Sequence, residues 1–307
     1  MRRRTSIRLT LLLLPALALT LAAYACAGGG QSTGQARHLA SFTWTAPAAQ
    51  DATWFGGFSG IEVQDNGRRL VVLSDRATLA RARITREAGL ITAAHITKRR
   101  RLRASTGNLL QGRVVDSEGL VRAPDGSLYI SFEGVSRIAH HKNGSSRAKV
   151  LPRPQAFRQL PLNKSLEALA MDDRGRLYTL PENAPDQNDE IPVWRWDGAR
   201  WSQPFSLPRR NGFMPVGADF GPDGRFYLLE RKFMLIGFRS RLRRWDITDV
   251  GAMQEITLFE TALGTHDNLE GVSVWRDEAG ALRATMISDD NFSALQRTEL
   301  VEYSLPD

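Results

Sequence analysis

A unit of strand, polar turn and second strand ending on an acid recurs about every 50 residues in this chain. The clearest copy runs from Ser165 to Glu182, and Ser117 to Glu133 has the same layout. The spacing from Glu118 to Tyr129 equals the spacing from Glu167 to Tyr178. Further copies lie at 59–75, 216–230 and 269–289. Repeats of this period are typical of propellers and arrays, so the repeat indicates the fold class before any single residue is interpreted.

Each unit is expected to hold four strands. Asp-Gly or Asn-Gly pairs separate apolar runs within the units, and such pairs favour the positive φ angles of tight hairpins. We find no convincing helical periodicity, and the chain of 307 residues is long enough to bury a full core as one domain. The sequence therefore predicts an all-β, single-domain β-propeller of four-stranded blades.

We count five blades, although a sixth could lie within the long first unit, 56–115. The fifth unit is one strand short, and one strand, His38–Thr45, is left over near the N-terminus. Pairing the N- and C-terminal strands would close the ring and remove open sheet edges. The alternative is that these are two unrelated strands of a sandwich.

The N-terminal segment is expected to be a signal peptide. Four arginines precede a fifteen-residue apolar run, 9–23, which is short for a membrane span. We place the signal peptide at 1–27, a flexible linker at 28–36 and the propeller domain at 37–307. Cys26, the only cysteine, resembles the lipidated residue of a bacterial lipoprotein, so a lipid anchor and plain cleavage are both considered. Either way we expect export to the periplasm or outside the cell, with no other membrane attachment.

The net charge of +8 overstates how basic the mature protein is, because the signal segment carries four arginines and no acid. No nucleic-acid motif is present, and we expect no nucleic-acid partner. Two basic runs, 98–103 and 239–244, are expected on solvated faces of outer strands. The alternative for both is attraction to an anionic surface or a phosphorylated ligand.

Acids recur at two positions of the unit. Glu118, Glu167 and Glu270 share one position on the first strand, where Val216 breaks the set. The first strand of a propeller blade lines the central channel, so these side chains should form a ring. A second set falls at or near the end of the second strand: Asp75, Glu133, Glu182, Glu230 and Asp289. Several carboxylates at the core of a fold must be paired or metal-bound, and calcium prefers oxygen ligands. The alternative is that they are structural and hold neighbouring strands together.

The loop 266–270 groups a histidine, an amide and two acids, which favours a functional role. Basic residues near the acids in sequence are candidates for contacts with an anionic substrate: Arg76, Arg113, Lys164, Arg231 and Lys232. Other chemistries are excluded by missing motifs, since there is no zinc spacing, Walker loop, dinucleotide fingerprint or cysteine nucleophile. Ser59 in Gly57–Ile61 does not fit a nucleophile elbow, because Ile61 replaces the second glycine.

Five segments together resemble the phytase-like family of exported bacterial propellers, described as having esterase-like activity of phytase. The segments are 57–61, 116–120, 164–169, 221–231 and 268–271, and the resemblance covers nearly everything from Phe55 to Leu305. It implies hydrolysis of a phosphate or other ester in the channel mouth, with calcium as one candidate cofactor. The histidine-acid phytase signature RHGxRxP is absent, so such chemistry would be metal-assisted.

The resulting hypothesis is an exported, monomeric hydrolase that acts on a small anionic ester with a divalent cation. Glu118, Glu167, Glu270 and His266 are the predicted catalytic residues. The predicted metal ligands are Glu118, Glu167, Asn268, Glu270 and Asp289. One alternative is a non-catalytic propeller that binds a ligand or an envelope partner. Another is a calcium-dependent lactonase-like propeller, for which Asn163, Asn268 and Asn291 would be suitable ligands.

Overall fold

The computed structural model describes residues 35–46, 52–142 and 147–307. The expected signal peptide, with Cys26, and most of the linker lie outside these residues. So does the predicted turn at Asn143-Gly144. Ala36–Asp307 forms one compact unit. Within the part of the chain that is described, no helix is long and apolar enough to cross a membrane.

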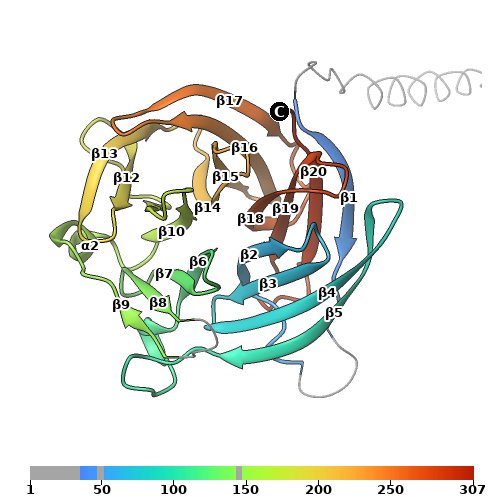
Figure 1. Cartoon of the computed structure of the whole chain (residues 1–307), viewed down its shortest axis with the longest axis horizontal. Coiled ribbons are helices and arrows are strands. Elements are labelled where there is room, and N and C mark those ends of the chain that lie inside the picture. The colour runs from blue at the N-terminus through green and yellow to red at the C-terminus, as the bar shows by residue number, and fades with distance from the viewer. Residues whose placement is uncertain (1–34, 47–51, 143–146) are drawn as a thin grey trace, which may run out of the picture. The chain divides into compact units, whose positions relative to one another are not determined.

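Five four-stranded antiparallel sheets surround a common centre and form a five-bladed propeller, as predicted (Figure 1). Blade 1 consists of β2 (Phe58–Gln64), β3 (Arg69–Ser74), β4 (Thr78–Glu87) and β5 (Leu90–Arg101). Blade 2 consists of β6 (Ser117–Arg122), β7 (Leu128–Phe132), β8 (Arg137–His141) and β9 (Lys149–Val150). Blade 3 consists of β10 (Leu166–Met171), β11 (Leu177–Pro181), β12 (Glu190–Trp196) and β13 (Trp201–Pro208).

Blade 4 consists of β14 (Met214–Phe220), β15 (Phe226–Met234), β16 (Gly237–Ile247) and β17 (Ala252–Glu260). Blade 5 consists of β18 (Asn268–Arg276), β19 (Leu282–Asp289), β20 (Glu299–Ser304) and the N-terminal β1 (Arg37–Thr43). The pairing of β1 with β20 confirms closure through both termini, and the long first unit forms one blade rather than two. Two short helices lie between blades, η1 (Gly112–Val114) and α2 (Gln155–Gln159).

The core is divided into five apolar clusters, each filling the space between two neighbouring blades. Between blades 4 and 5, for example, Tyr227 and Leu229 belong to the same buried cluster as Val272 and Val274. Trp44 joins a cluster with Phe58 and Ile287, so the N-terminal segment helps to join blade 5 to blade 1. Each blade is therefore held by its neighbours, as expected for a ring of repeats that bury little surface alone.

The first strand of every blade is innermost, as the repeat predicts. β2, β6, β10, β14 and β18 each contact the next inner strand around the ring. Glycines make this approach possible at two clear positions. A Cβ on Gly119 would lie 2.7 Å from the carbonyl oxygen of Glu167, and one on Gly217 would overlap the carbonyl oxygen of Glu270. The inner strands therefore pack closely enough to bring their side chains into one narrow channel.

Candidate functional site

One β-bulge interrupts the pairing of the inner strand in every blade, at the same place each time. The register shifts after Phe58, Ser117, Leu166, Pro215 and Leu269. Bulges re-aim side chains and often occur beside functional sites. The five bulges contain the residues that we call the bulge ring: Ser59, Glu118, Glu167, Val216 and Glu270. All five are buried.

The bulge ring confirms the repeat position deduced from the sequence and adds Ser59 as its fifth member. Ser59 is 3% exposed, and its hydroxyl oxygen has no hydrogen-bond partner among the described residues. Its equivalence to Glu118 could have been found by aligning Phe58-Ser59-Gly60 with Ser117-Glu118-Gly119. An unpartnered buried hydroxyl in a ring of carboxylates is an available polar ligand.

A second ring lies on the second strand of each blade. Its members directly follow the residue that pairs with the inner strand just before the bulge. Phe58 pairs with Ser74, Leu166 with Pro181 and Leu269 with Ser288, so the next residues, Asp75, Glu182 and Asp289, are equivalent. In blade 4, Pro215 pairs with Glu230, and the equivalent residue is therefore Arg231. We call these positions the end ring: Asp75, Glu133, Glu182, Arg231 and Asp289.

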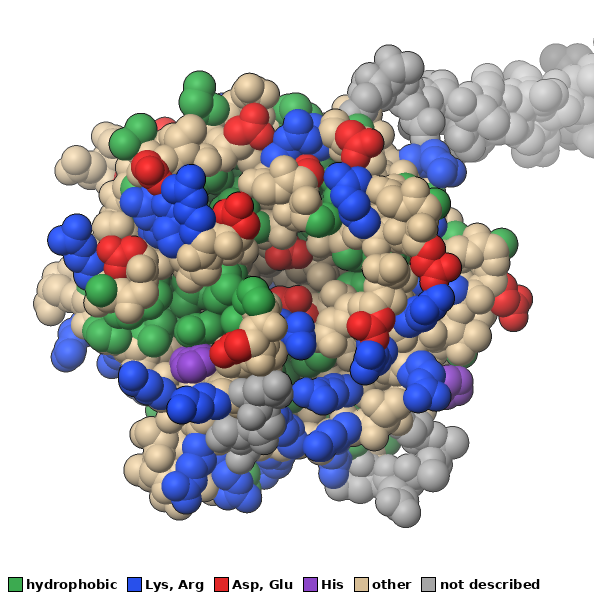
Figure 2. Space-filling model, viewed as in Figure 1, with side chains coloured by type: hydrophobic (Ala, Val, Ile, Leu, Met, Phe, Trp, Pro, Cys, Tyr) green, Lys and Arg blue, Asp and Glu red, His purple; other side chains and the backbone are tan. Residues whose placement is uncertain are grey.

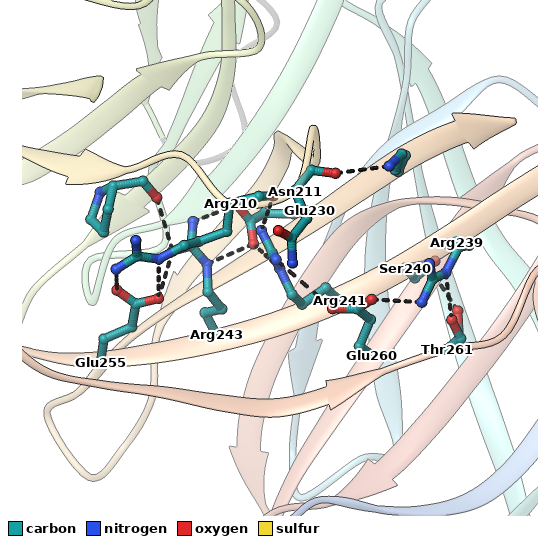
Figure 3. Close-up of polar contacts among 12 residues, drawn as sticks. Arg210, Asn211, Glu230, Arg239, Ser240, Arg241, Arg243, Glu255, Glu260 and Thr261 are labelled. Atoms are coloured by element: carbon teal, nitrogen blue, oxygen red, sulfur yellow. Dashed lines mark hydrogen bonds and ion pairs between the residues drawn. The ribbon is translucent and has the colours of Figure 1, made fainter. Parts of the chain in front are cut away.

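The placement of Glu230 in this set was therefore wrong by one residue. A shift of one residue along a strand turns a side chain to the opposite face. Glu230 accordingly points into blade 4, where it is fully buried and accepts hydrogen bonds from Arg241 and Arg243 (Figure 3). The nitrogen–oxygen distances are 2.7 Å for Arg241 Nε and 2.5 Å for Arg243 Nη2.

The second basic run was also predicted incorrectly. Residues 239–244 were expected on a solvated face, but Arg241, Arg243 and Arg244 are buried on β16, the third strand of the blade. Glu230 supplies the charge that makes this burial possible, and Arg243 also binds Glu255 at 3.0 Å. The first basic run differs, because Lys98, Arg99 and Arg101 on β5 are exposed.

Eight carboxyl groups gather at one end of the channel, which we call the mouth. They are the acids of the two rings together with Asp116, which directly precedes β6: Asp75, Asp116, Glu118, Glu133, Glu167, Glu182, Glu270 and Asp289. Asp116 was not singled out by the sequence. It lies outside both rings, so the repeat gave no signal for it.

Arg231 forms the ion pairs of the mouth. It donates to Asn268 Oδ1 at 2.6 Å, to Glu182 Oε1 at 3.1 Å, and to Glu270. The other six mouth acids form no ion pair with any residue of the described ranges, 35–46, 52–142 and 147–307. Arg231 thus links Glu182 of blade 3 to Glu270 of blade 5, across blade 4, where Val216 takes the place of an acid. The other six carboxyl groups of the mouth have no basic partner of this kind within the described residues.

Burial raises the pKa of several mouth acids above the ordinary value of such groups. Burial, with added repulsion from Glu270 and other mouth acids, raises the pKa of Glu118 well above its ordinary value. Burial and the charge of Glu118 do the same to the pKa of Glu167. Burial raises the pKa of Asp75 to about 6, and burial with the charge of Glu270 raises that of Asp289 to about 8. Desolvation and like charge both disfavour ionisation.

The carboxyl groups also lie close to one another. Asp116 lies beside Glu118 and Glu133, and Glu133 lies beside Glu167. Two ionised carboxylates have no donor to share, so such closeness favours a proton or a cation between them.

Among the residues that the structure describes, two groups of acids have the spacing of a metal site. In one group, oxygens of Asp116, Glu118 and Glu133 lie within 4.8 Å of one another, and in the other those of Glu133, Glu167 and Glu182 do. Glu133 belongs to both groups. Such buried acidic clusters could hold a metal ion, and an all-oxygen donor set suits hard cations. The two predicted ligands Glu118 and Glu167 lie in these groups, whereas Glu133, Glu182 and Asp116 were not predicted as ligands.

The other predicted ligands lie beside these groups. Asn268 donates from Nδ2 to Glu270 Oε1 at 2.9 Å, and its carbonyl oxygen accepts from Arg231. Asp289 is the end-ring acid of blade 5, and its carboxylate accepts from the backbone of Asn291 at 2.6 Å. The negative charges of Glu270 and Asp75 also repel that of Asp289, which helps to raise the pKa of Asp289.

His266 lies apart from the acids in its contacts. Its Nε2 is 2.8 Å from the hydroxyl of Tyr303, and its ring lies 5.4 Å from that of His38. Burial lowers the pKa of His266 to about 4, so the ring is neutral at physiological pH. The side chains that His266 contacts, His38 and Tyr303, therefore belong to the outer strands β1 and β20 rather than to the channel.

The predicted basic residues are spread around the mouth. Arg76 follows Asp75 directly, and its guanidinium stacks 3.3 Å above the ring of Phe292. Lys164 is exposed and donates its backbone N–H to Glu133. Lys232 donates from Nζ to the carbonyl oxygen of Asn211 at 2.9 Å. Arg113 is exposed in η1, next to blade 2. Of the predicted set, Arg231 is the residue whose side chain forms ion pairs with the mouth acids within the described ranges.

Comparison with known proteins identifies the family. The model of a family described as "Phytase-like: Esterase-like activity of phytase" matches residues 53–292. The chain belongs to this phytase-like family. The resemblance stated from the sequence is confirmed, and the matched region includes every member of both rings. No curated protein sequence matches this chain significantly.

Solved structures agree on the fold. The α-L-arabinofuranosidase PaAbf62A from Podospora anserina, solved in complex with cellotriose, has a TM-score of 0.54 at 12% identity. The match covers 89% of this chain and 98% of that one. The catalytic domain of the Coprinopsis cinerea GH62 α-L-arabinofuranosidase has a TM-score of 0.53 at 14% identity, covering 88% and 97%. At such identities the likeness of this phytase-like chain to them concerns the propeller alone.

Proposed function

We propose that this phytase-like propeller is an exported hydrolase that cleaves a phosphomonoester or a related ester at the mouth, with the help of a divalent cation. The observation that carries the proposal is the charge imbalance of the mouth: within the described residues, only two of its eight carboxyl groups form an ion pair, both with Arg231. Membership of a family described by esterase-like activity supports a hydrolytic reaction. Export rests on the N-terminal segment of the sequence.

The residues present fit a divalent cation. Glu118 and Glu167 are buried and have close carboxylate neighbours, as oxygen ligands of calcium commonly do. Asp116, Glu133 and Glu182 complete the two groups, and Asn268, Glu270 and Asp289 lie beside them. A bound cation would polarise the ester and lower the pKa of a water molecule. Calcium is the first ion to test, because the donors are all oxygen.

The protein's own residues have separate tasks in this proposal. Arg231 holds Glu182 and Glu270 in fixed positions, so that these two acids keep their geometry when a ligand enters. Arg76, Lys164 and Lys232 lie around the mouth and would neutralise the oxyanions of an incoming ester. Burial excludes water from the ring acids, which strengthens their attraction for a cation.

The test is hydrolysis by the full chain of p-nitrophenyl phosphate, a p-nitrophenyl carboxylate ester and a lactone, each with calcium and with a chelator. We expect turnover of a phosphate or carboxylate ester that chelation removes. Glu118→Gln should lower this activity by at least about tenfold, as losses around metal sites commonly do. Glu278→Gln is the matched control, because Glu278 is exposed and far from the mouth in its contacts.

Three results would contradict the proposal. Full activity of Glu118→Gln would remove the mouth as the site. Saturable binding of an ester without turnover would favour the non-catalytic binding propeller. Cleavage of the lactone alone would favour the lactonase-like alternative.

A further inference from the structure

A groove lined by basic side chains lies beside blade 1, away from the mouth. It has a volume of about 710 Å³ and receives side chains from β3, β4, β5 and the end of β6. We call it the basic groove and define it by Arg69, Arg81, Arg83, Lys98 and Arg122. Arg122 ends β6, whereas Glu118 is the second residue of that strand, so the two lie about 13 Å apart along the strand. Lys and Arg side chains gather along the lower edge of the view in Figure 2, over β4, β5, β8 and β9.

The positive charge of the basic groove has almost no protein counter-charge. Asp65 forms an ion pair with Arg69. Arg81, Arg83, Lys98 and Arg122 form no ion pair within the described part of the chain. Glu62 accepts a hydrogen bond from the backbone N–H of Arg122 at 2.8 Å and is attracted by the charge of Arg122, but the two side chains form no ion pair.

The strand register places like charges opposite one another in the groove. Arg69 pairs with Arg83 across β3 and β4, and Arg81 pairs with Lys98 across β4 and β5. Like charges directly opposite on a sheet are destabilising. All four side chains are exposed. The arrangement costs stability, and Asp65 compensates only Arg69 among the four, as expected of a surface that binds anions.

Two further observations point to the same chemistry. Gln64 lines the groove, and its amide nitrogen is buried without a hydrogen-bond partner among the described residues. An adjoining hollow extends the groove along Arg99 and Arg100. Burial, with the nearby charge of Arg81, lowers the pKa of Arg100, so the charges here are partly desolvated. Both a free amide donor and desolvated guanidinium groups favour an oxyanion ligand.

We propose that the basic groove binds a ligand with several clustered phosphate groups. Guanidinium groups bind phosphate through two parallel hydrogen bonds, and five cations in one groove match several negative charges better than one. The groove volume exceeds that of a single phosphate ion. The phosphates could belong to a soluble oligophosphate or to the headgroups of an anionic lipid surface, and the experiment separates these sources. The proposal does not depend on hydrolysis at the mouth.

The experiment is calorimetric titration of the full chain with inorganic tripolyphosphate, orthophosphate and sulfate at fixed ionic strength, without divalent cations. We expect tripolyphosphate to bind with one saturable site and at least tenfold more tightly than orthophosphate or sulfate. Arg81→Gln combined with Lys98→Gln should weaken binding at least tenfold. The matched control is Arg174→Gln combined with Arg200→Gln, which removes the same charge from exposed positions of blade 3. Melting temperatures should be measured to confirm that both variants fold.

Sedimentation with vesicles of phosphatidylglycerol, compared with phosphatidylcholine, tests the lipid source. Binding to phosphatidylglycerol vesicles that is lost in the groove variant but kept in the control also supports the proposal and assigns the phosphates to lipid. Equal weakening in both variants would overturn it, because the attraction would then reflect net charge. Absence of both tripolyphosphate and vesicle binding would overturn it as well. Glu118→Gln should leave tripolyphosphate binding unchanged, which separates this test from that of the proposed function.

Discussion

Two buried acidic sites in this propeller, Glu230 in blade 4 and the mouth, differ in how far the chain's own arginines balance their negative charge. In blade 4, Glu230 is fully buried, but Arg241 and Arg243 surround it with hydrogen bonds and Glu255 balances the second arginine (Figure 3). At the mouth, six of eight acids have no ion pair within the described residues. The first place is neutralised by the chain itself.

The difference shows where the chain supplies its own counter-charge and where an external cation could supply it. A buried charge is tolerated when it is paired, protonated or metal-bound. Glu230 uses the first of these solutions. At the mouth without a cation, the raised pKa values of Glu118 and Glu167 favour the second. The same substitution, glutamate to glutamine, should therefore have opposite effects on stability in the two places.

The largest expected effect is at Glu230. Glu230→Gln leaves Arg241 and Arg243 buried with one charge uncompensated, and breaking a buried pair in this way costs about 3–5 kcal/mol. Urea unfolding should show this loss with calcium and with a chelator alike. A loss below about 1 kcal/mol would mean that the arginines find other partners.

The opposite sign is expected at the mouth. Glu118→Gln removes one of several repelling groups, so in chelator at pH 8.5 it should stabilise the fold, by about 1–3 kcal/mol. Calcium should then stabilise this variant less than the wild type, since a ligand has been lost. If Glu118→Gln were less stable than the wild type in chelator, the carboxylate would have a structural partner. That result would favour the alternative that these acids hold neighbouring strands together.

The pH dependence of the metal-free protein should have a definite sign. An acid whose pKa is raised by folding keeps its proton in the folded state after the unfolded chain has lost it. The contribution of this proton to folding stability is therefore complete near pH 3.8, the ordinary pKa of an aspartic acid, and it decreases as the pH rises. The decrease ends near pH 6 for Asp75 and near pH 8 for Asp289, where their folded-state pKa values lie. Urea unfolding in chelator should show stability falling across this window.

Asp289→Asn should flatten that fall between pH 6 and 8, the upper part of the window set by the value of about 8. Asp173→Asn, at an exposed position of blade 3, should leave the profile unchanged. Calcium should oppose the fall, because it replaces protons as the counter-charge. A profile that is flat in chelator would contradict the electrostatic description of the mouth.

The smallest effect concerns the backbone that carries the bulge ring. A Cβ on Gly119 would lie 2.7 Å from the carbonyl oxygen of Glu167, so Gly119→Ala should cost about 1–3 kcal/mol. Gly251→Ala is the matched control, because nothing lies within 4 Å of its Cβ position. Equal stability of the two variants by thermal unfolding would mean that blades 2 and 3 can separate slightly.

The fold was predictable because local signals repeat. Turn glycines such as Gly126 and Gly175 have the positive φ that their hairpins require, and five copies of one pattern give five blades. The leftover strand at the N-terminus predicted closure correctly. The sequence also predicted which residues share a ring, because equivalent residues of the repeats lie at the same depth in the channel. Glu118, Glu167 and Glu270 do so.

The site was only partly predictable, because register decides which side chain enters the channel. Glu230 and Arg231 are adjacent, and the sequence alone favoured the acid at the end ring. The strand β15 continues to Met234, and its pairing places Arg231 there instead. The burial of Arg241 and Arg243 depends on that same choice. Asp116 precedes its strand and follows no repeat, and only the folded chain brings it to Glu133.

The most direct test of the account is calcium binding by the full chain, measured by calorimetric titration and by melting temperature with calcium and with chelator at pH 8. We predict one or more saturable sites and a higher melting temperature in calcium, because a ligand at 100 times its Kd stabilises the native state by about 2.7 kcal/mol. Glu118→Gln should weaken binding, and Glu278→Gln should not. No binding of calcium, magnesium or manganese, with equal melting temperatures in chelator, would contradict the central proposal that the mouth binds an external cation.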